Sequence, residues 1–222
     1  MTTVTLSGEW DDYLAVLRED AHRLLAWSYA DTRAALVSAR DEYDMTGLLA
    51  AAMHERIISP HTPERFAFYS VHNERPISPA GELGKARPKL DIQIERCGVR
   101  PKRFYTIEAK RLRDDEKASV AATLGHYFGA DGVGRFVSGR YDADGIEAAM
   151  LGCIQAHNAA FWFEQFEANF GSDTNSGRDA FKLAEPFQRC SVISDLPDEA
   201  STLHRRADGS RIRLMHVALD CT

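Results

Sequence analysis

Two neighbouring segments in the middle of the chain hold the residues best suited to chemistry. Asp91 lies in a strand-like segment, residues 89–95, and Glu108 and Lys110 lie in a second one, residues 103–110. A glycine and a proline in the connection favour a turn, so the two segments form, most simply, an antiparallel hairpin. If this hairpin is symmetric about its turn, Asp91 lies opposite Glu108.

A pair of carboxylates in this position indicates a bound cation, because like charges directly across a sheet destabilise it. Hard divalent ions such as Mg²⁺ (or Mn²⁺) take a few carboxylate oxygens and retain several waters. Such an ion polarises a phosphate and lowers the pKa of the attacking water. With Lys110 two residues from Glu108, the pattern points to phosphodiester hydrolysis. The alternative is a solvated sheet face on which Glu108 and Lys110 form an ion pair worth about 0–1 kcal/mol.

Hydrophobic periodicity predicts the elements that would position these residues. Helices are expected over residues 10–39, 114–128 and 158–170. A further helix is expected after the acidic stretch 41–44, with Thr46 as its N-terminal cap and Pro60 at its end. Strands are expected over residues 65–72, 89–95, 103–110, 149–155 and 211–220, with loops over 73–87 and 171–180. This order predicts a mixed α/β sandwich with one sheet.

Asp91 followed by Glu108-Ala109-Lys110 resembles the D…(D/E)-x-K signature of the PD-(D/E)XK nuclease superfamily, which has the restriction-endonuclease-like fold. The resemblance implies that Asp91 and Glu108 bind metal. It also implies that Lys110 helps to position or activate the attacking water and stabilises charge on the phosphate.

The family often adds a glutamate from the first core helix, for which Glu42 is the candidate and Glu55 the reserve. The chain departs from the namesake motif because Leu90, not proline, precedes Asp91. The family's core order of helix, three strands, helix and strand corresponds to residues 41–170.

We therefore expect one α/β domain over residues 1–222, with a restriction-endonuclease-like mixed sheet flanked by helices. An N-terminal helical extension (1–40) precedes the α-β-β-β-α-β core, and a C-terminal elaboration (171–222) ends in an added strand.

The charge distribution favours a phosphate-bearing substrate. The formal net charge is −6, yet residues 85–117 carry eleven bases against six acids and a charge of +5, which leaves −11 on the remainder. A basic cluster beside paired carboxylates is suited to contact with a nucleic-acid backbone. The candidate backbone contacts are Lys85, Arg87, Lys89, Arg100, Lys102, Arg103, Arg111 and Arg113. The alternative is that such residues discourage pairing at strand edges.

Composition excludes several classes of protein. The 222 residues are 44% hydrophobic and 27% charged, unlike disordered or fibrous chains. No apolar run reaches the ~20 residues of a membrane span, and the first residues do not resemble a signal peptide. Four cysteines (Cys97, Cys153, Cys190 and Cys221) form no CxxC pair, so we expect free thiols and a cytoplasmic protein.

Two further features have ordinary structural interpretations. His216 on the last strand is expected to be a hydrogen-bonded structural histidine. The aromatic run in residues 161–170 could stack on bases or contact a partner, but core packing is favoured for such a stripe.

The resulting expectation is a Mg²⁺-dependent DNA endonuclease. The resemblance implies a nuclease effector of a bacterial anti-phage system, recruited by an ATPase, helicase or sensor protein. The acidic remainder of the chain and the aromatic helix are compatible with docking to such a partner or with homodimerisation. The alternative is a catalytically inactive adaptor that keeps the fold and binds protein or nucleic acid. RNA cleavage at the same site is a third possibility.

Overall fold

The computed structural model describes residues 7–37, 41–76, 89–99, 102–141, 144–171, 183–196 and 198–222. Its helices are α1 (Ser7–Thr32), η1 (Arg33–Ala35), α2 (Glu42–Ile58), η2 (Glu64–Phe68), α3 (Val120–Phe128), α4 (Val133–Val137) and α5 (Ala159–Gly171). Its strands are β1 (Tyr69–Pro76), β2 (Lys89–Arg96), β3 (Phe104–Leu112), β4 (Glu147–Ile154), β5 (Leu183–Cys190), β6 (Glu199–Arg205) and β7 (Arg211–Asp220).

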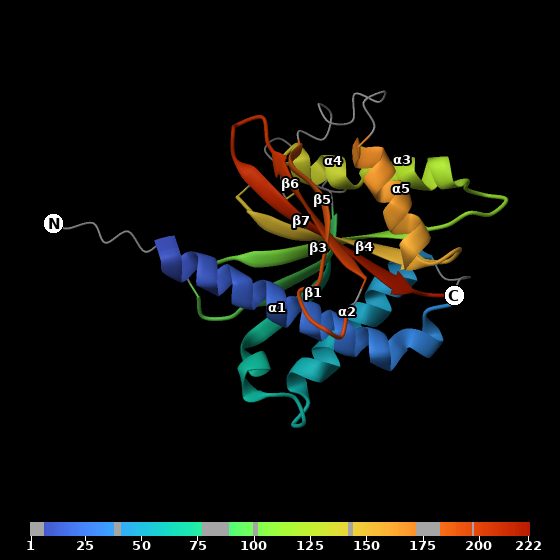
Figure 1. Cartoon of the computed structure of the whole chain (residues 1–222). Coiled ribbons are helices and arrows are strands. Elements are labelled where there is room, and N and C mark those ends of the chain that lie inside the picture. The colour runs from blue at the N-terminus through green and yellow to red at the C-terminus, as the bar shows by residue number, and fades with distance from the viewer. Residues whose placement is uncertain are drawn as a thin grey trace.

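In the described part of the chain, seven strands form one open sheet at the centre of this α/β fold, in the order β1-β2-β3-β4-β7-β6-β5. β4 runs parallel to both β3 and β7, and the other four pairings are antiparallel. Helices cover both faces, with α1 and α2 on one side and α3, α4 and α5 on the other (Figure 1). The expected α/β class with one mixed sheet is confirmed.

The N-terminal helix is part of the first hydrophobic core. Leu24 of α1 and Met53 of α2 are fully buried there with Ile107 of β3. His22 of α1 also makes buried polar contacts, with the Tyr105 hydroxyl at 2.6 Å and with the Glu199 carboxylate. These contacts join α1 to β3 and β6.

Helix α2 begins earlier than the expected Thr46 cap. The Asp41 side chain caps it by accepting a hydrogen bond from the Asp44 amide at 2.8 Å. Thr46 is buried within the helix, where its hydroxyl donates to the Glu42 carbonyl. Acidic residues in a first helical turn are favoured by the helix dipole, so the acidic stretch forms this turn. Glu42 is consequently the first residue of α2.

Several other expected boundaries are wrong for local reasons. Residues 64–68 form η2 instead of the start of a strand, and β1 follows at Tyr69. Helix α3 starts at Val120, not at residue 114, because the Asp115 side chain accepts hydrogen bonds from two following amides and closes a turn. Ser119 then caps α3 through the Ala122 amide.

The C-terminal part contributes three strands, of which only β7 was expected. β7 pairs with β4, so it lies inside the sheet. β5 is an edge strand with register shifts, and β6 is largely buried despite its polar sequence. The missed strands extend the sheet beyond the expected core.

Side chains of α5 pack into a second hydrophobic core, separate from the one that contains Leu24 and Met53. Core packing was the interpretation that the sequence favoured. Trp162, Phe163, Phe166 and Phe170 are all buried. Their rings are therefore not exposed for stacking on bases or for docking a partner.

Four free cysteines are present, as expected. Cys153 and Cys221 are buried, Cys190 is partly buried and Cys97 is exposed. Among the described helices, none is long and apolar enough to cross a membrane.

His216 is a structural histidine, as expected. It is fully buried on β7, with Nε2 2.9 Å from the Thr202 hydroxyl and Nδ1 3.1 Å from the Tyr127 hydroxyl. Burial, with a smaller effect of His204, lowers the pKa of His216 to about 3.

This residue should make the fold sensitive to acid. Because the unfolded imidazole (pKa about 6.5) binds a proton that the native one does not, stability is retained above pH 6.5 and lost below it. From pH 7 to pH 5, His216 should lower the free energy of unfolding by about 2 kcal/mol. Urea denaturation of wild type and His216→Gln tests this, since the variant should show a loss smaller by that amount. Parallel pH profiles would contradict it.

Candidate functional site

The Lys110 ammonium is the centre of the candidate site. Its Nζ donates to the Glu42 Oε1 at 3.0 Å, the Glu108 Oε1 at 2.9 Å and the Ala109 carbonyl at 2.7 Å. An ammonium has three donors, so each one has an acceptor. The fold therefore brings together residues of α2 and β3 that are 68 positions apart in the chain.

Asp91 lies beside this cluster on the neighbouring strand. The antiparallel ladder ends at the pair Ile92↔Ile107, and one further step in the same register sets Asp91 across from Glu108. The Asp91 Oδ2 accepts a hydrogen bond from the Ala109 amide at 2.7 Å. This bond anchors the Asp91 carboxylate to β3.

Burial strongly affects the acids of the site. It raises the pKa of Asp91 to about 6, although Lys110 acts in the opposite direction. Burial and then the Asp91 charge raise the pKa of Glu108 to about 8, against the effect of Lys110. Burial alone would lower the pKa of Lys110, but the three carboxylates outweigh it and raise that pKa. The cluster thus holds three carboxyl groups and one ammonium, and burial shields it from water.

The described residues leave one oxygen of Glu108 without a hydrogen-bond partner. Its Oε2 is buried and accepts no hydrogen bond from the described residues. A buried unsatisfied carboxylate oxygen is costly, and a cation is one group that satisfies it.

The structure separates the two glutamates considered for the first core helix. Glu42 reaches Lys110, whereas Glu55 is exposed on the same helix. Thirteen residues of helix place their backbones roughly 20 Å apart. Glu42 is thus the member of the cluster.

The glycine-containing segment of residues 129–141, to which the sequence analysis gave no role, also approaches the carboxylates. Tyr141 is fully buried, and its hydroxyl donates to the Lys89 carbonyl at 2.9 Å and contacts the Arg135 guanidinium. Burial, reinforced by the charges of Glu108 and Asp91, raises the pKa of Tyr141 to about 12. The repeated glycines of this segment were the available signal, because they permit close backbone packing.

Gly132 shows why that segment needs glycine. A Cβ at this position would lie 1.9 Å from the Tyr127 carbonyl oxygen, whereas a Cβ at Gly125 would meet nothing within 4 Å. Gly132→Ala should lower the free energy of unfolding by about 3 kcal/mol, as expected for a backbone clash. Gly125→Ala, inside α3, should raise it by up to about 1 kcal/mol. Chemical denaturation of the two variants tests this contrast, and equal stabilities would contradict it.

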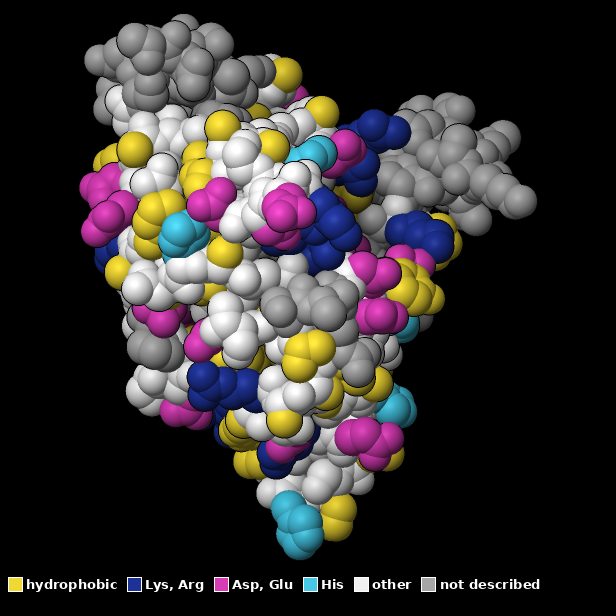
Figure 2. All heavy atoms as spheres, turned by 90° about the vertical axis from the view of Figure 1, so that its right-hand side faces the viewer, with side chains coloured by type: hydrophobic (Ala, Val, Ile, Leu, Met, Phe, Trp, Pro, Cys, Tyr) yellow, Lys and Arg dark blue, Asp and Glu magenta, His cyan; other side chains and the backbone are white. Residues whose placement is uncertain are grey.

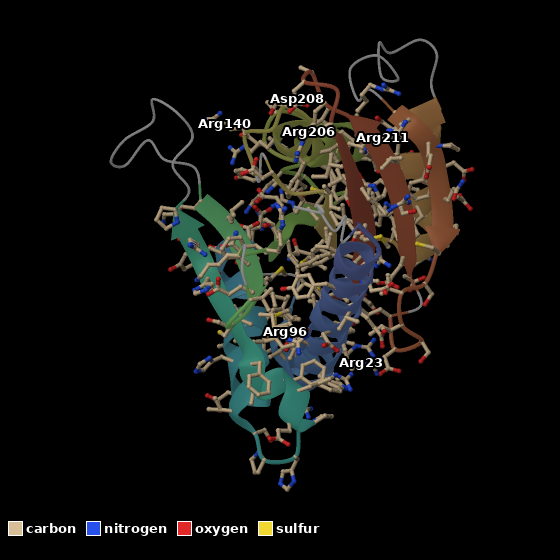
Figure 3. All side chains as sticks on the ribbon, turned by 90° about the vertical axis from the view of Figure 1, so that its left-hand side faces the viewer. Arg23, Arg96, Arg140, Arg206, Asp208 and Arg211 are labelled. Carbon is tan, nitrogen blue, oxygen red and sulfur yellow. The ribbon has the colours of Figure 1, made fainter. Side chains whose placement is uncertain are left out.

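The basic residues proposed for backbone contact do not form one patch. Arg111 and Arg113 follow Lys110 at the end of β3, while Lys102 and Arg103 lie at the turn end of the hairpin. At a rise of about 3.3 Å per residue, the eight residue steps from Arg103 to Arg111 span roughly 26 Å. Two other basic residues, Arg96 near the turn end and Arg140 ahead of β4, are also well separated in Figure 3. Lys85, Arg87 and Arg100 lie outside the described residues.

Several of these bases are paired with acids. Lys89 lies 2.6 Å from Glu74, Lys102 lies 3.1 Å from Glu95, and Arg113 lies 3.3 Å from Asp115. Arg103 donates to the Asp144 carbonyl at 3.3 Å. On the face drawn in Figure 2, basic and acidic side chains are interspersed. The positive charge available around these residues is therefore smaller than the +5 counted over residues 85–117 of the sequence.

Comparisons of the chain with models of protein families, with curated proteins and with solved structures find no match. Within the described ranges, no group of three or more His, Cys, Asp and Glu side chains is arranged to hold a metal ion. Asp91 and Glu108 remain as a two-carboxylate candidate. Two carboxylates are enough for Mg²⁺, which usually keeps several of its waters.

Proposed function

We propose that the protein is a metal-dependent DNA endonuclease of the PD-(D/E)XK type. The observation that carries this proposal is the Lys110 ammonium bonded between the Glu42 and Glu108 carboxylates, with Asp91 on the adjoining strand. The order α2, β1, β2, β3, α3, β4 supports a restriction-endonuclease-like core.

The donor set fits Mg²⁺ or Mn²⁺. Asp91 and Glu108 offer hard carboxylate oxygens, and the Glu108 Oε2 has no partner among the described residues. A bound ion would polarise the phosphate and lower the pKa of a water molecule. Asp91 and Glu108 would hold it.

The remaining residues have roles that follow from their contacts. Glu42 and the Ala109 carbonyl hold the Lys110 ammonium at the edge of the carboxylate pair. From there Lys110 supplies positive charge to a phosphate that gains charge during attack. The bond from the Ala109 amide keeps Asp91 oriented.

The alternative is a catalytically inactive adaptor of the same fold. The ion pairs of Lys89, Lys102 and Arg113 favour it, because they reduce the positive charge available to DNA. The broader setting, an anti-phage effector working with an ATPase, helicase or sensor, is implied by the family resemblance only, and the cytoplasmic location is proposed from the four free cysteines.

Incubation of the purified protein with supercoiled plasmid, phage DNA and RNA tests the proposal. Wild type should cut DNA with Mg²⁺ or Mn²⁺ and be inactive in EDTA. Binding without cleavage under every metal condition would favour the adaptor. Cleavage of RNA alone would revise the substrate and retain the site.

A further inference from the structure

A cleft of about 330 Å³ opens beside the carboxylate cluster. Lys110 and Glu42 form the wall that it shares with the cluster, and the segment from the end of β3 into α3 forms much of the rest. This volume is at the lower end of the range for ligand pockets. It suits one nucleotide-sized group and is too small for a duplex.

The lining of the cleft is rich in cations. Arg111, Arg113 and Lys117 join Lys110 there, against the two carboxylates of Glu42 and Asp131. Thr123 and His126 add polar side chains from α3. Clustered Lys and Arg side chains are suited to phosphate recognition.

Two of the lining side chains, Lys117 and His126, make no side-chain hydrogen bond or ion pair with any residue that the structure describes. Lys117 is exposed, and its ammonium makes no hydrogen bond or ion pair there, in contrast to the Arg113 guanidinium, which contacts Asp115. The His126 ring likewise has no hydrogen bond to a described residue. Both can donate to a ligand without breaking an existing contact.

The local fold fixes where Lys117 lies. The Asp115 side chain accepts from the Lys117 amide at 2.7 Å and from the Ala118 amide at 3.0 Å. The Thr123 hydroxyl donates to the Arg113 carbonyl at 2.8 Å, which ties α3 to the end of β3. The wall of the cleft is therefore held in place by hydrogen bonds.

We infer that this cleft binds the phosphate of the nucleotide next to the cleaved bond. The inference rests on the proposed function and extends it to a second contact with the substrate. Because Lys110 and Glu42 belong to both places, a group in the cleft lies one side chain away from the carboxylates. Two neighbouring phosphates of one DNA strand can therefore lie at the carboxylates and in the cleft at the same time. Lys117 and His126 would donate hydrogen bonds to the phosphate in the cleft.

Binding in the absence of cleavage tests the inference. The probe is a fluorescein-labelled 12-nucleotide single-stranded DNA in EDTA, and the readout is anisotropy across a salt series. The Lys117→Gln/His126→Gln variant should bind about tenfold more weakly. Loss of one phosphate contact should also reduce the slope of log affinity against log salt by about 0.7.

The matched control is Arg23→Gln/His54→Gln, which removes a cation and a histidine from α1 and α2 at positions that do not line the cleft. It should bind as wild type does. Lys117→Gln alone, at an exposed position, should show a smaller loss in the same direction and guards against misfolding of the double variant.

The possible results separate the two proposals. If Lys117→Gln/His126→Gln and Lys117→Gln both bind DNA with the same affinity and salt slope as wild type, the inference is overturned, even if the protein cuts DNA. Weaker binding by the cleft variants, with no cleavage by wild type in any metal, would support the cleft as a phosphate site and count against the nuclease.

Discussion

Replacing Lys110 with methionine should reduce the rate of DNA cleavage by about a thousandfold, while the protein stays folded. Methionine keeps much of the length of the side chain but removes the ammonium that Glu42 and Glu108 hold at the edge of the site. Positioned acid–base or charge-stabilising groups contribute about 10²–10⁴ in rate, so the expected loss lies within that range. Initial rates of plasmid nicking in Mn²⁺ measure it.

Arg18→Met is the matched control for loss of an ion pair. The Arg18 guanidinium lies 2.5 Å from the Glu147 carboxylate, away from the carboxylate cluster, and is partly buried. This variant should keep wild-type cleavage, and circular dichroism should report folded protein for both. Equal cleavage by wild type and Lys110→Met would remove the cluster from the chemistry.

Glu108→Gln should stabilise the cation-free protein at alkaline pH. Because the native pKa of Glu108 is raised to about 8, its unfolded form releases a proton that the native form keeps. Its contribution to stability is therefore full below about pH 4.5 and is lost as the pH rises to 8. From pH 5 to pH 8, the wild type should lose about 3 kcal/mol relative to Glu108→Gln in EDTA, as measured by urea denaturation.

Divalent cations should reverse this ranking. A ligand that binds only the native state stabilises it by mass action, so Mn²⁺ should raise the melting temperature of wild type. Glu108→Gln should lose most of that rise, whereas Glu55→Gln should keep it, since Glu55 is exposed on α2 away from Lys110. Identical Mn²⁺ responses in all three proteins would contradict the assignment of Glu108 as a ligand.

Local patterns were sufficient to anticipate the central hairpin. The alternation of β3 and the turn before it predicted a register that the ladder Ile92↔Ile107 and Gln93↔Thr106 bears out. β7 and α5 were also found from their periodicity. Each of these elements has a regular pattern and a buried face, the conditions under which periodicity predicts well.

What the sequence did not predict depends on long-range contacts or on competing local hydrogen bonds. β6 has a polar sequence, yet it is buried because Glu199 bonds His22 of α1 and Thr202 bonds two histidines. No pattern within seven residues encodes such partners. The placement of Tyr141 near Asp91 and Glu108 likewise depends on how the glycine-containing segment packs.

The charge along the chain was a less reliable guide than the charge in space. The window of residues 85–117 counts as +5 in the sequence. In the fold, Lys89 pairs with Glu74, which lies outside this window, and Lys102 pairs with Glu95, which lies inside it. The two lysines lie at opposite ends of the hairpin. Backbone contact is therefore expected at the Lys110 end, next to the cleft.

The most direct measurement of the central claim is anomalous diffraction from crystals soaked in Mn²⁺. We expect one strong peak within about 2–2.5 Å of carboxylate oxygens of both Asp91 and Glu108, typical of a hard divalent ion. Crystals of Glu108→Gln should show no such peak. A protein that cuts DNA in Mn²⁺ while its only ordered Mn²⁺ lies away from these two carboxylates would contradict this claim.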